Sequence, residues 1–155
     1  MGKLNALKRP GKKGLAVIAV MIFIISAGIA VFCFMDNQKT VDFTVLSESK
    51  IPQEITSDVI PEYRALERAL ACLVDDKVYV VVTRGEKPAS GYKVDIRKMK
   101  LENDNEKETL IVYADFTDPD RDSSVSQVIT YPVKVAETEL KKLPDDLELR
   151  VQYLE

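Results

Sequence analysis

The residues that could carry out chemistry in this chain are few, because the 155-residue sequence contains no histidine and only two cysteines. The absence of histidine excludes Ser-His and Cys-His nucleophile pairs and histidine-bound zinc. Ser90 and Lys87 are close in sequence, but a Ser-Lys dyad needs a fixed geometry that sequence proximity alone does not supply. We therefore expect a protein that binds rather than an enzyme, with no catalytic residue and no cofactor.

One acidic segment, Asp118-Pro-Asp-Arg-Asp122, places carboxylates at the first, third and fifth positions of a calcium-loop pattern. The sixth position is Ser123 rather than glycine, and the twelfth is Ile129 rather than glutamate. The EF-hand pattern therefore fails, and we expect a charged turn between strands and no metal site. A looser calcium site on the surface is the alternative.

The segment best suited to recognition is the loop from Arg84 to Tyr92, RGEKPASGY. Its two glycines suggest backbone angles that other residues avoid, and Pro88 pushes the preceding residue toward an extended shape. A loop that is stiff before it meets a partner loses little entropy on binding. The alternative is an ordinary connection with a tight turn at each end. The candidate binding residues are Gly85, Glu86, Lys87, Pro88, Ser90, Gly91 and Tyr92.

Two motifs in this part of the chain resemble the C-terminal domain of the PrcB family. The family pattern has a G-E-K-P-[ST]-G-G-Y loop, followed later by a polar and hydrophobic strand that ends in T-Y-P. Ala89-Ser90 stands where the family has a hydroxyl residue and a glycine, so Ser90 offers its hydroxyl one position later. The first motif is matched by Gly85, Glu86, Lys87, Pro88, Gly91 and Tyr92, and the second by Gln127, Thr130, Tyr131 and Pro132.

The resemblance covers residues 78–135 and implies an extracytoplasmic bacterial domain. The protein that gives the family its name is associated with a secreted protease, so the resemblance implies an unidentified protein partner, such as a protease. It carries over no catalytic residue. The alternative function is a structural or assembly domain of the cell envelope without any link to a protease.

The spacing of apolar residues predicts a mainly β, α+β domain, in which a sandwich-like antiparallel sheet packs against one amphipathic helix. Residues 61–73 are the expected helix, because Leu66, Leu70 and Leu73 form one stripe and Pro61 suits a first helical turn. Asp75-Asp76 is expected to end that helix. Lys77 to Thr83 is β-branched and apolar, which is typical of a buried central strand.

Period-two alternation predicts the other strands of the domain. The same alternation favours a core position for Tyr92. A polar stretch at 102–108 is expected to be the tip of a hairpin, and residues 53–58 a short helical turn. The predicted strands lie at 43–46, 92–97, 110–116, 125–135 and 147–153.

The N-terminal part of the chain contains 22 consecutive uncharged residues, from Gly14 to Met35. At about 1.5 Å per residue this run is long enough to cross the roughly 30 Å hydrocarbon core of a bilayer as one helix. The basic residues that precede it predict a cytoplasmic N-terminus. They are Lys3, Lys8, Arg9, Lys12 and Lys13. A cleaved signal peptide is the alternative, although its apolar region is usually shorter.

Charge completes the predicted layout of a single-pass membrane protein. The first 35 residues hold five of the 22 basic residues and none of the 25 acidic ones, so the remainder has a net charge of about −8. An acidic domain of this kind disfavours nucleic acid as a partner. We expect a cytoplasmic tail at 1–13, a transmembrane helix at 14–35, a linker at 36–42 and an extracytoplasmic PrcB-like domain at 43–155.

Overall fold

The computed structural model describes residues 38–104, 107–120 and 122–154. The predicted cytoplasmic tail and the predicted membrane span at 14–35 lie outside the described residues. Within the described ranges, no helix is long and apolar enough to cross a membrane.

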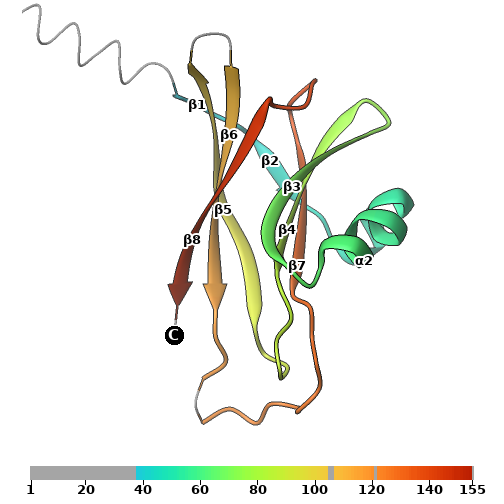
Figure 1. The fold of residues 1–155 in the computed structure, drawn as a ribbon, viewed down its shortest axis with the longest axis vertical. Helices are drawn as coiled ribbons and strands as arrows, with labels where there is room; N and C mark the ends of the chain where they lie inside the picture. The colour runs from blue at the N-terminus through green and yellow to red at the C-terminus, as the bar shows by residue number, and fades with distance from the viewer. Residues whose placement is uncertain (1–37, 105–106, 121, 155) are drawn as a thin grey trace, which may run out of the picture. The chain divides into compact units, whose positions relative to one another are not determined.

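The described residues form two four-stranded sheets (Figure 1). One sheet has the order β1-β5-β6-β8, and the other has the order β2-β7-β4-β3. Neighbouring strands are antiparallel except β6 and β8, which are parallel. The mainly β prediction is therefore confirmed, with one parallel pair that it did not include. The strands are β1 (Gln38–Thr40), β2 (Phe43–Val45), β3 (Glu67–Val74), β4 (Lys77–Arg84), β5 (Lys93–Asp104), β6 (Lys107–Thr117), β7 (Val133–Thr138) and β8 (Asp146–Leu154).

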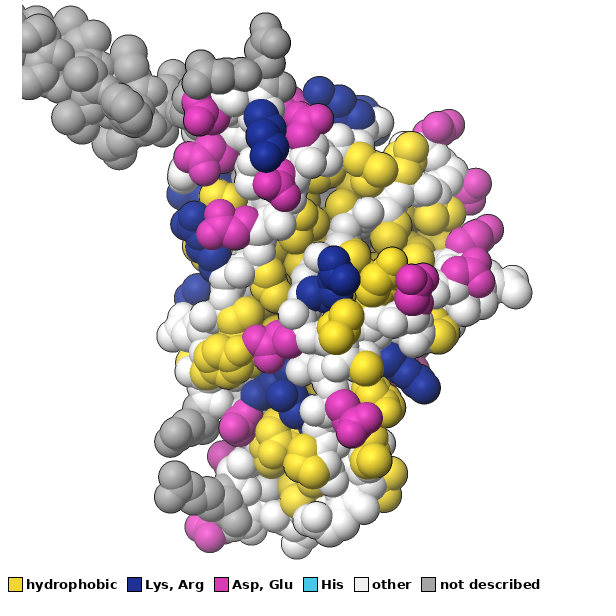
Figure 2. Space-filling view, in the orientation of Figure 1, with side chains coloured by type: hydrophobic (Ala, Val, Ile, Leu, Met, Phe, Trp, Pro, Cys, Tyr) yellow, Lys and Arg dark blue, Asp and Glu magenta, His cyan; other side chains and the backbone are white. Residues whose placement is uncertain are grey.

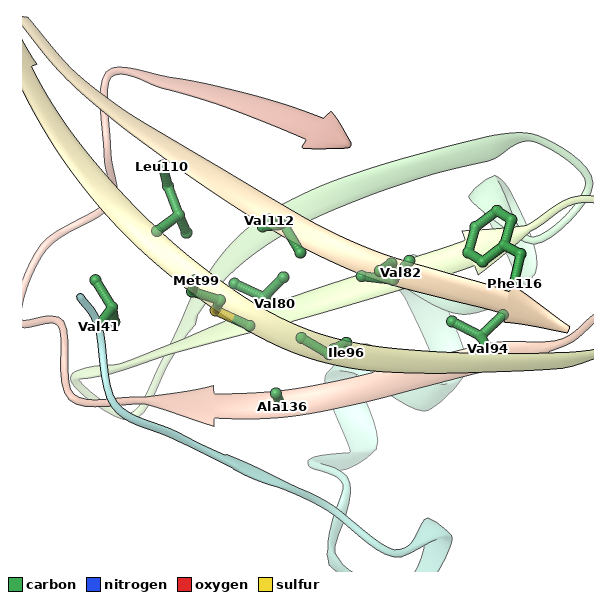
Figure 3. Close-up of a cluster of buried hydrophobic side chains, with 11 residues drawn as sticks. Val41, Val80, Val82, Val94, Ile96, Met99, Leu110, Val112, Phe116 and Ala136 are labelled. Atoms are coloured by element: carbon green, nitrogen blue, oxygen red, sulfur yellow. The ribbon is translucent and has the colours of Figure 1, made fainter. Parts of the chain in front are cut away.

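The main core lies between the two sheets (Figure 3). Val80 and Val82 of β4 meet Met99 of β5 and Val112 and Phe116 of β6, and each of these five side chains is fully buried. A second cluster lies on the opposite face of β4, where Tyr79 and Val81 contact Ile55 and Val135. Residues 78–84 are all buried, as the sequence predicts for a central strand covered on both faces.

The first strand begins inside the predicted linker. Gln38–Thr40 pairs with residues 100–102 of β5, and Val41 is only 2% exposed in the main core. The chain then crosses to the other sheet, where Phe43–Val45 pairs with β7. The linker prediction at 36–42 is therefore wrong for residues 38–41, which belong to the folded domain.

The predicted amphipathic helix at 61–73 is wrong in position. The helical residues come earlier, in a π-helical turn at Ile55–Val59 and in α2 (Ile60–Tyr63), which extends the short helical turn predicted at 53–58. Residues 67–74 are instead strand β3, and every one of them pairs with β4. Leu66 and Leu73 are about half exposed, so the leucine stripe is not a buried face. Pairing with the buried strand β4 outweighs local helix propensity here.

The other predicted strands differ mainly in their limits. Those predicted at 43–46, 92–97, 110–116 and 147–153 correspond to β2, β5, β6 and β8. The strand predicted at 125–135 is shorter and shifted, because regular pairing begins only at Val133. The hairpin tip predicted at 102–108 is tighter than expected, since β5 and β6 remain paired as far as Asp104 and Lys107.

Asp75 and Asp76 form the two-residue turn of the β3–β4 hairpin rather than the end of a helix. Their φ angles are 48° and 59°, which places both in the left-handed region. A two-residue turn with positive φ at both positions matches the right-handed twist of the strands, and it favours glycine at the second position.

Asp76→Gly is therefore expected to raise the free energy of unfolding by about 0.5 kcal/mol, because relief of left-handed strain exceeds the added entropy of the unfolded chain. Urea denaturation of the two proteins measures the difference. Asp120→Gly is the control, since Asp120 is exposed, does not have a positive φ and should give no gain. A less stable Asp76→Gly protein would contradict the assignment of this turn.

Candidate functional site

The two sequence motifs, about 40 residues apart, lie side by side in the structure. Lys87 and Thr130 form an antiparallel bridge with two backbone hydrogen bonds, each 2.9 Å long. Arg84 N donates to Pro132 O at 3.0 Å, and Ser90 N donates to Ser126 O at 2.9 Å. Residues 85–92 and 126–132 therefore form one structural unit, which we call the paired-loop platform.

Side-chain hydroxyls join the same two segments. The Thr130 hydroxyl donates to Ala89 O at 2.7 Å, and the Ser90 hydroxyl accepts from Ser126 N at 2.9 Å. The Ser90 hydroxyl thus serves the platform although it stands one position later than in the family pattern. Lys87 does not contact it; its ammonium lies 5.9 Å from the centre of the Tyr92 ring. These contacts hold the two segments together, and Lys87 is not placed as a base for Ser90.

Both glycines of the loop have the positive φ that the sequence predicts, 76° at Gly85 and 95° at Gly91. A Cβ atom on Gly91 would lie 2.9 Å from Cβ of Pro119 and 3.2 Å from a methyl group of Val125. The chain that leads from β6 toward the second motif therefore packs directly on this glycine. Gly91 is required both for its backbone angle and for this close approach.

Arg84 is a residue of the site that the motif analysis did not select. Its side chain is 2% exposed, and its guanidinium forms an ion pair with Asp118 and donates to Lys93 O at 3.3 Å and to Thr117 O. It also lies 5.0 Å from the centre of the Tyr92 ring and 5.3 Å from that of Phe116. The sequence does contain a signal for this role, because Arg84 is a charged residue at the end of the apolar strand β4. A charge that is buried in this way requires partners.

Asp118 has a structural role in this arrangement that the calcium-loop reading did not include. It begins the acidic segment 118–122, and its carboxylate is the partner of Arg84. Among the described residues, no group of three or more His, Cys, Asp or Glu is placed to hold a metal ion. The segment lies between β6 and β7, which agrees with the expected charged turn between strands.

Tyr131 and Glu86 form a second link across the platform. The Tyr131 hydroxyl donates to the Glu86 carboxylate at 2.7 Å, and the guanidinium of Arg64 lies 4.5 Å from the centre of the Tyr131 ring. The hydrogen bond to Glu86 is the main reason that the pKa of Tyr131 is raised above its ordinary value; desolvation adds to the shift and Arg64 opposes it. Arg64 follows α2, so the helical segment also reaches the platform.

Glu86→Gln is therefore expected to lower the pKa of Tyr131 toward the ordinary value of about 10, because the phenol loses a carboxylate acceptor. NMR titration with ring-labelled tyrosine follows each phenol separately. Tyr113, which contacts Arg150 and not Glu86, serves as the internal control. An unchanged Tyr131 titration would mean that this link is absent in solution.

The predicted site residues occupy different positions on the platform. Glu86, Pro88, Gly91 and Gln127 are exposed, whereas Lys87, Tyr92 and Thr130 are half-buried. Tyr92 lies beneath Arg84 rather than in the centre of the core, so its predicted core position is correct only in part. Ser90, Tyr131 and Pro132 are also half-buried, and Gly85 is buried.

Two large apolar residues project from the platform. Val128 is 61% exposed and Ile129 is 56% exposed. In Figure 2, hydrophobic side chains gather at the lower end of the molecule, where Figure 1 draws the β4–β5 loop and the chain leading into β7. Neither residue was among the predicted binding residues, although both lie inside the second motif.

Comparison with known proteins agrees with this geometry. Residues 78–139 match the family model described as PrcB C-terminal, which includes β4, the whole platform and β7. Comparison with curated proteins and with solved structures found no match. The paired loops are thus contained within the matched segment, and residues 78–139 of this chain are similar to the PrcB C-terminal domain.

Proposed function

We propose that this chain is a membrane-tethered, non-catalytic module of the extracytoplasmic side that binds another protein through the paired-loop platform. The observation that carries the proposal is the combination of a cross-braced backbone with exposed apolar residues at its tip. Backbone and side-chain groups of the platform hydrogen-bond to one another and hold its shape. Among its described residues, none is arranged as a nucleophile with a base.

The rigidity of the platform favours binding. Bonds at Lys87–Thr130 and Ser90–Ser126 fix both segments before any partner arrives, so little conformational entropy remains to be lost. Val128 and Ile129 then offer apolar area whose burial supplies affinity. The phenol of Tyr131, with Arg64 above it, adds the residue types that are enriched at the centres of protein interfaces.

The proposed partner is a secreted or envelope protease, or another subunit of its complex. Two observations support a protease as the partner. The PrcB family is named for a protease complex subunit, and the segment that matches its family model contains the platform. The uncharged run at 14–35 would hold the module at the membrane surface and raise its local concentration near such a partner.

The test uses the full chain expressed in its native membrane with a photo-crosslinking amino acid at position 129. We expect one discrete crosslinked protein, identified by mass spectrometry. The double variant Val128→Ser/Ile129→Ser, with the crosslinker moved to position 127, should reduce its yield at least about tenfold, because the apolar contact area is lost.

The matched control replaces two exposed leucines outside the platform, as Leu73→Ser/Leu143→Ser, again with the crosslinker at position 127. This variant should retain the crosslink. Equal yields from both double variants would contradict a role for the platform, and a crosslinked partner unrelated to proteolysis would contradict the protease link alone.

A second candidate function, an assembly domain of the cell envelope, is favoured by the two sheet edges formed by β3 and β8. These strands are eight and nine residues long, and an edge strand can pair with another chain. Light scattering of the full chain in detergent distinguishes the two functions. Self-association that survives Val128→Ser/Ile129→Ser would favour assembly through the edges.

A further inference from the structure

A depression of about 590 Å³ lies on the outer side of the β1-β5-β6-β8 sheet, away from the platform. It is lined by Thr40, Arg97, Lys98, Lys100 and Tyr113, with three cations and no acidic residue among them. The domain as a whole is acidic, with a net charge of about −8 over residues 36–155. A concentrated positive patch on such a domain calls for a specific explanation.

The shape of the depression follows from the short first strand. β1 pairs with only residues 100–102 of β5 before Val41 turns into the core. Residues 93–98 of β5 therefore have no strand on that side within the described part of the chain. The depression lies over β5 and is lined by Thr40 on the β1 side and by Tyr113 on the β6 side.

A β-bulge concentrates the positive charge. The register of β5 against β6 shifts between Ile96 and Lys98, which leaves Arg97 as an extra residue. Consecutive strand residues normally point to opposite faces, but here Arg97 and Lys98 are both exposed and both line the depression. Bulges of this kind redirect side chains and are enriched next to functional sites.

The lining offers hydrogen-bond donors almost exclusively. Lys98 has no hydrogen bond or ion pair within the described residues, and the Lys100 ammonium uses one donor on the neutral Gln38 amide at 2.7 Å. The Tyr113 hydroxyl accepts from Arg150 at 3.2 Å, which leaves its proton free to be donated. Arg97 is balanced by Asp115 at 3.5 Å, so two uncompensated positive charges remain.

We propose that this depression binds a phosphate ester of a small polyol. Two ammonium groups without an ion pair and two hydroxyls suit the oxygens of a phosphate, which accept hydrogen bonds and carry negative charge. The volume exceeds that of a bare phosphate ion and accommodates the attached polyol. Such a group occurs in a phospholipid headgroup and in a soluble or polymeric polyol phosphate, which share this chemistry.

The experiment measures acetylation of individual lysines by mass spectrometry on the full chain in a neutral detergent. One arm adds glycerol phosphate, with glycerol as the uncharged control. The other arm adds dihexanoyl phosphatidylglycerol to the micelles, with dihexanoyl phosphatidylcholine as the control. We expect the ligand to slow acetylation of Lys98 and Lys100 at least about fivefold, while Lys77 and Lys142, which pair with glutamates elsewhere, react unchanged.

Calorimetric titration with glycerol phosphate then compares the affinity of two matched double variants with that of the unchanged protein. Lys98→Gln/Lys100→Gln should weaken binding at least about tenfold, whereas Lys77→Gln/Lys142→Gln, which removes the same charge, should change it less than twofold. Protection in only one arm identifies the source of the phosphate ester and supports the site. Absence of protection in both arms, or equal weakening by both double variants, would overturn the proposal. Neither result depends on the paired-loop platform.

Discussion

Arg84→Met is expected to lower the free energy of unfolding by about 3–5 kcal/mol, mainly because the carbonyl groups of Lys93 and Thr117 each lose a charged donor. The ion pair itself contributes less, because the Asp118 side chain is 52% exposed and can be solvated. The methionine retains the apolar stem but leaves Asp118 without its cation and two carbonyls without a donor. The stacking of the guanidinium on Tyr92 and Phe116 is lost as well. Urea denaturation gives the loss, with an unchanged slope indicating that the unfolded state is unaffected.

The control for this prediction is Arg150→Met, which removes an exposed arginine paired with the exposed Glu148. An exposed pair contributes little, so the expected loss is below about 1 kcal/mol. Arg84→Lys should recover only part of the stability, because an ammonium cannot reach both carbonyls and the carboxylate as the planar guanidinium does. A loss below 1 kcal/mol in Arg84→Met would show that Arg84 does not organise the base of the platform.

Gly91→Val has the second largest expected effect, a loss of about 2–4 kcal/mol. Valine is strained at a φ of 95°, and its Cβ would lie 2.9 Å from Pro119. The loop must move to relieve this contact, which separates Ser90 from Ser126. Hydrogen exchange should therefore show lost protection at the amides of Ser90 and Ser126, together with the lower stability.

Pro88→Ala is the control within the same loop. Pro88 is exposed, so its replacement should cost less than about 1 kcal/mol, mainly through added freedom of the unfolded chain. The Ser90 and Ser126 amides should remain protected. If Gly91→Val leaves both amides protected, the close approach of Pro119 does not set the position of this loop.

Much of the fold was accessible from the sequence because most of its strands carry their own signal. The apolar run in β4 and the alternation in β5, β6 and β8 follow directly from which faces are buried. Residues 67–74 were misassigned because leucine and alanine favour a helix locally, whereas the pairing with β4 is a long-range interaction. β1 was missed because three polar residues at a sheet edge show no periodic pattern.

The two loop motifs are visible in the sequence, but the geometry that joins them is not. The glycines and Pro88 indicated a stiff loop, and the two motifs named both halves of the platform. Their contact through Lys87 and Thr130 joins positions 43 residues apart, which no local pattern encodes. The position of Arg84 against the Tyr92 ring likewise depends on where β5 begins and β6 ends, so its role is visible only in three dimensions.

The strand order has a consequence for any attempt to isolate the matched segment. Residues 78–139 contain β4, β5, β6 and β7, the inner strands of both sheets, while the outer strands β1, β2, β3 and β8 lie outside that range. A fragment cut at those limits would present the apolar strand β4 as a bare edge, a ready template for aggregation. A fragment meant to stay in solution therefore has to include the outer strands as well, and so to run from Gln38 to Leu154.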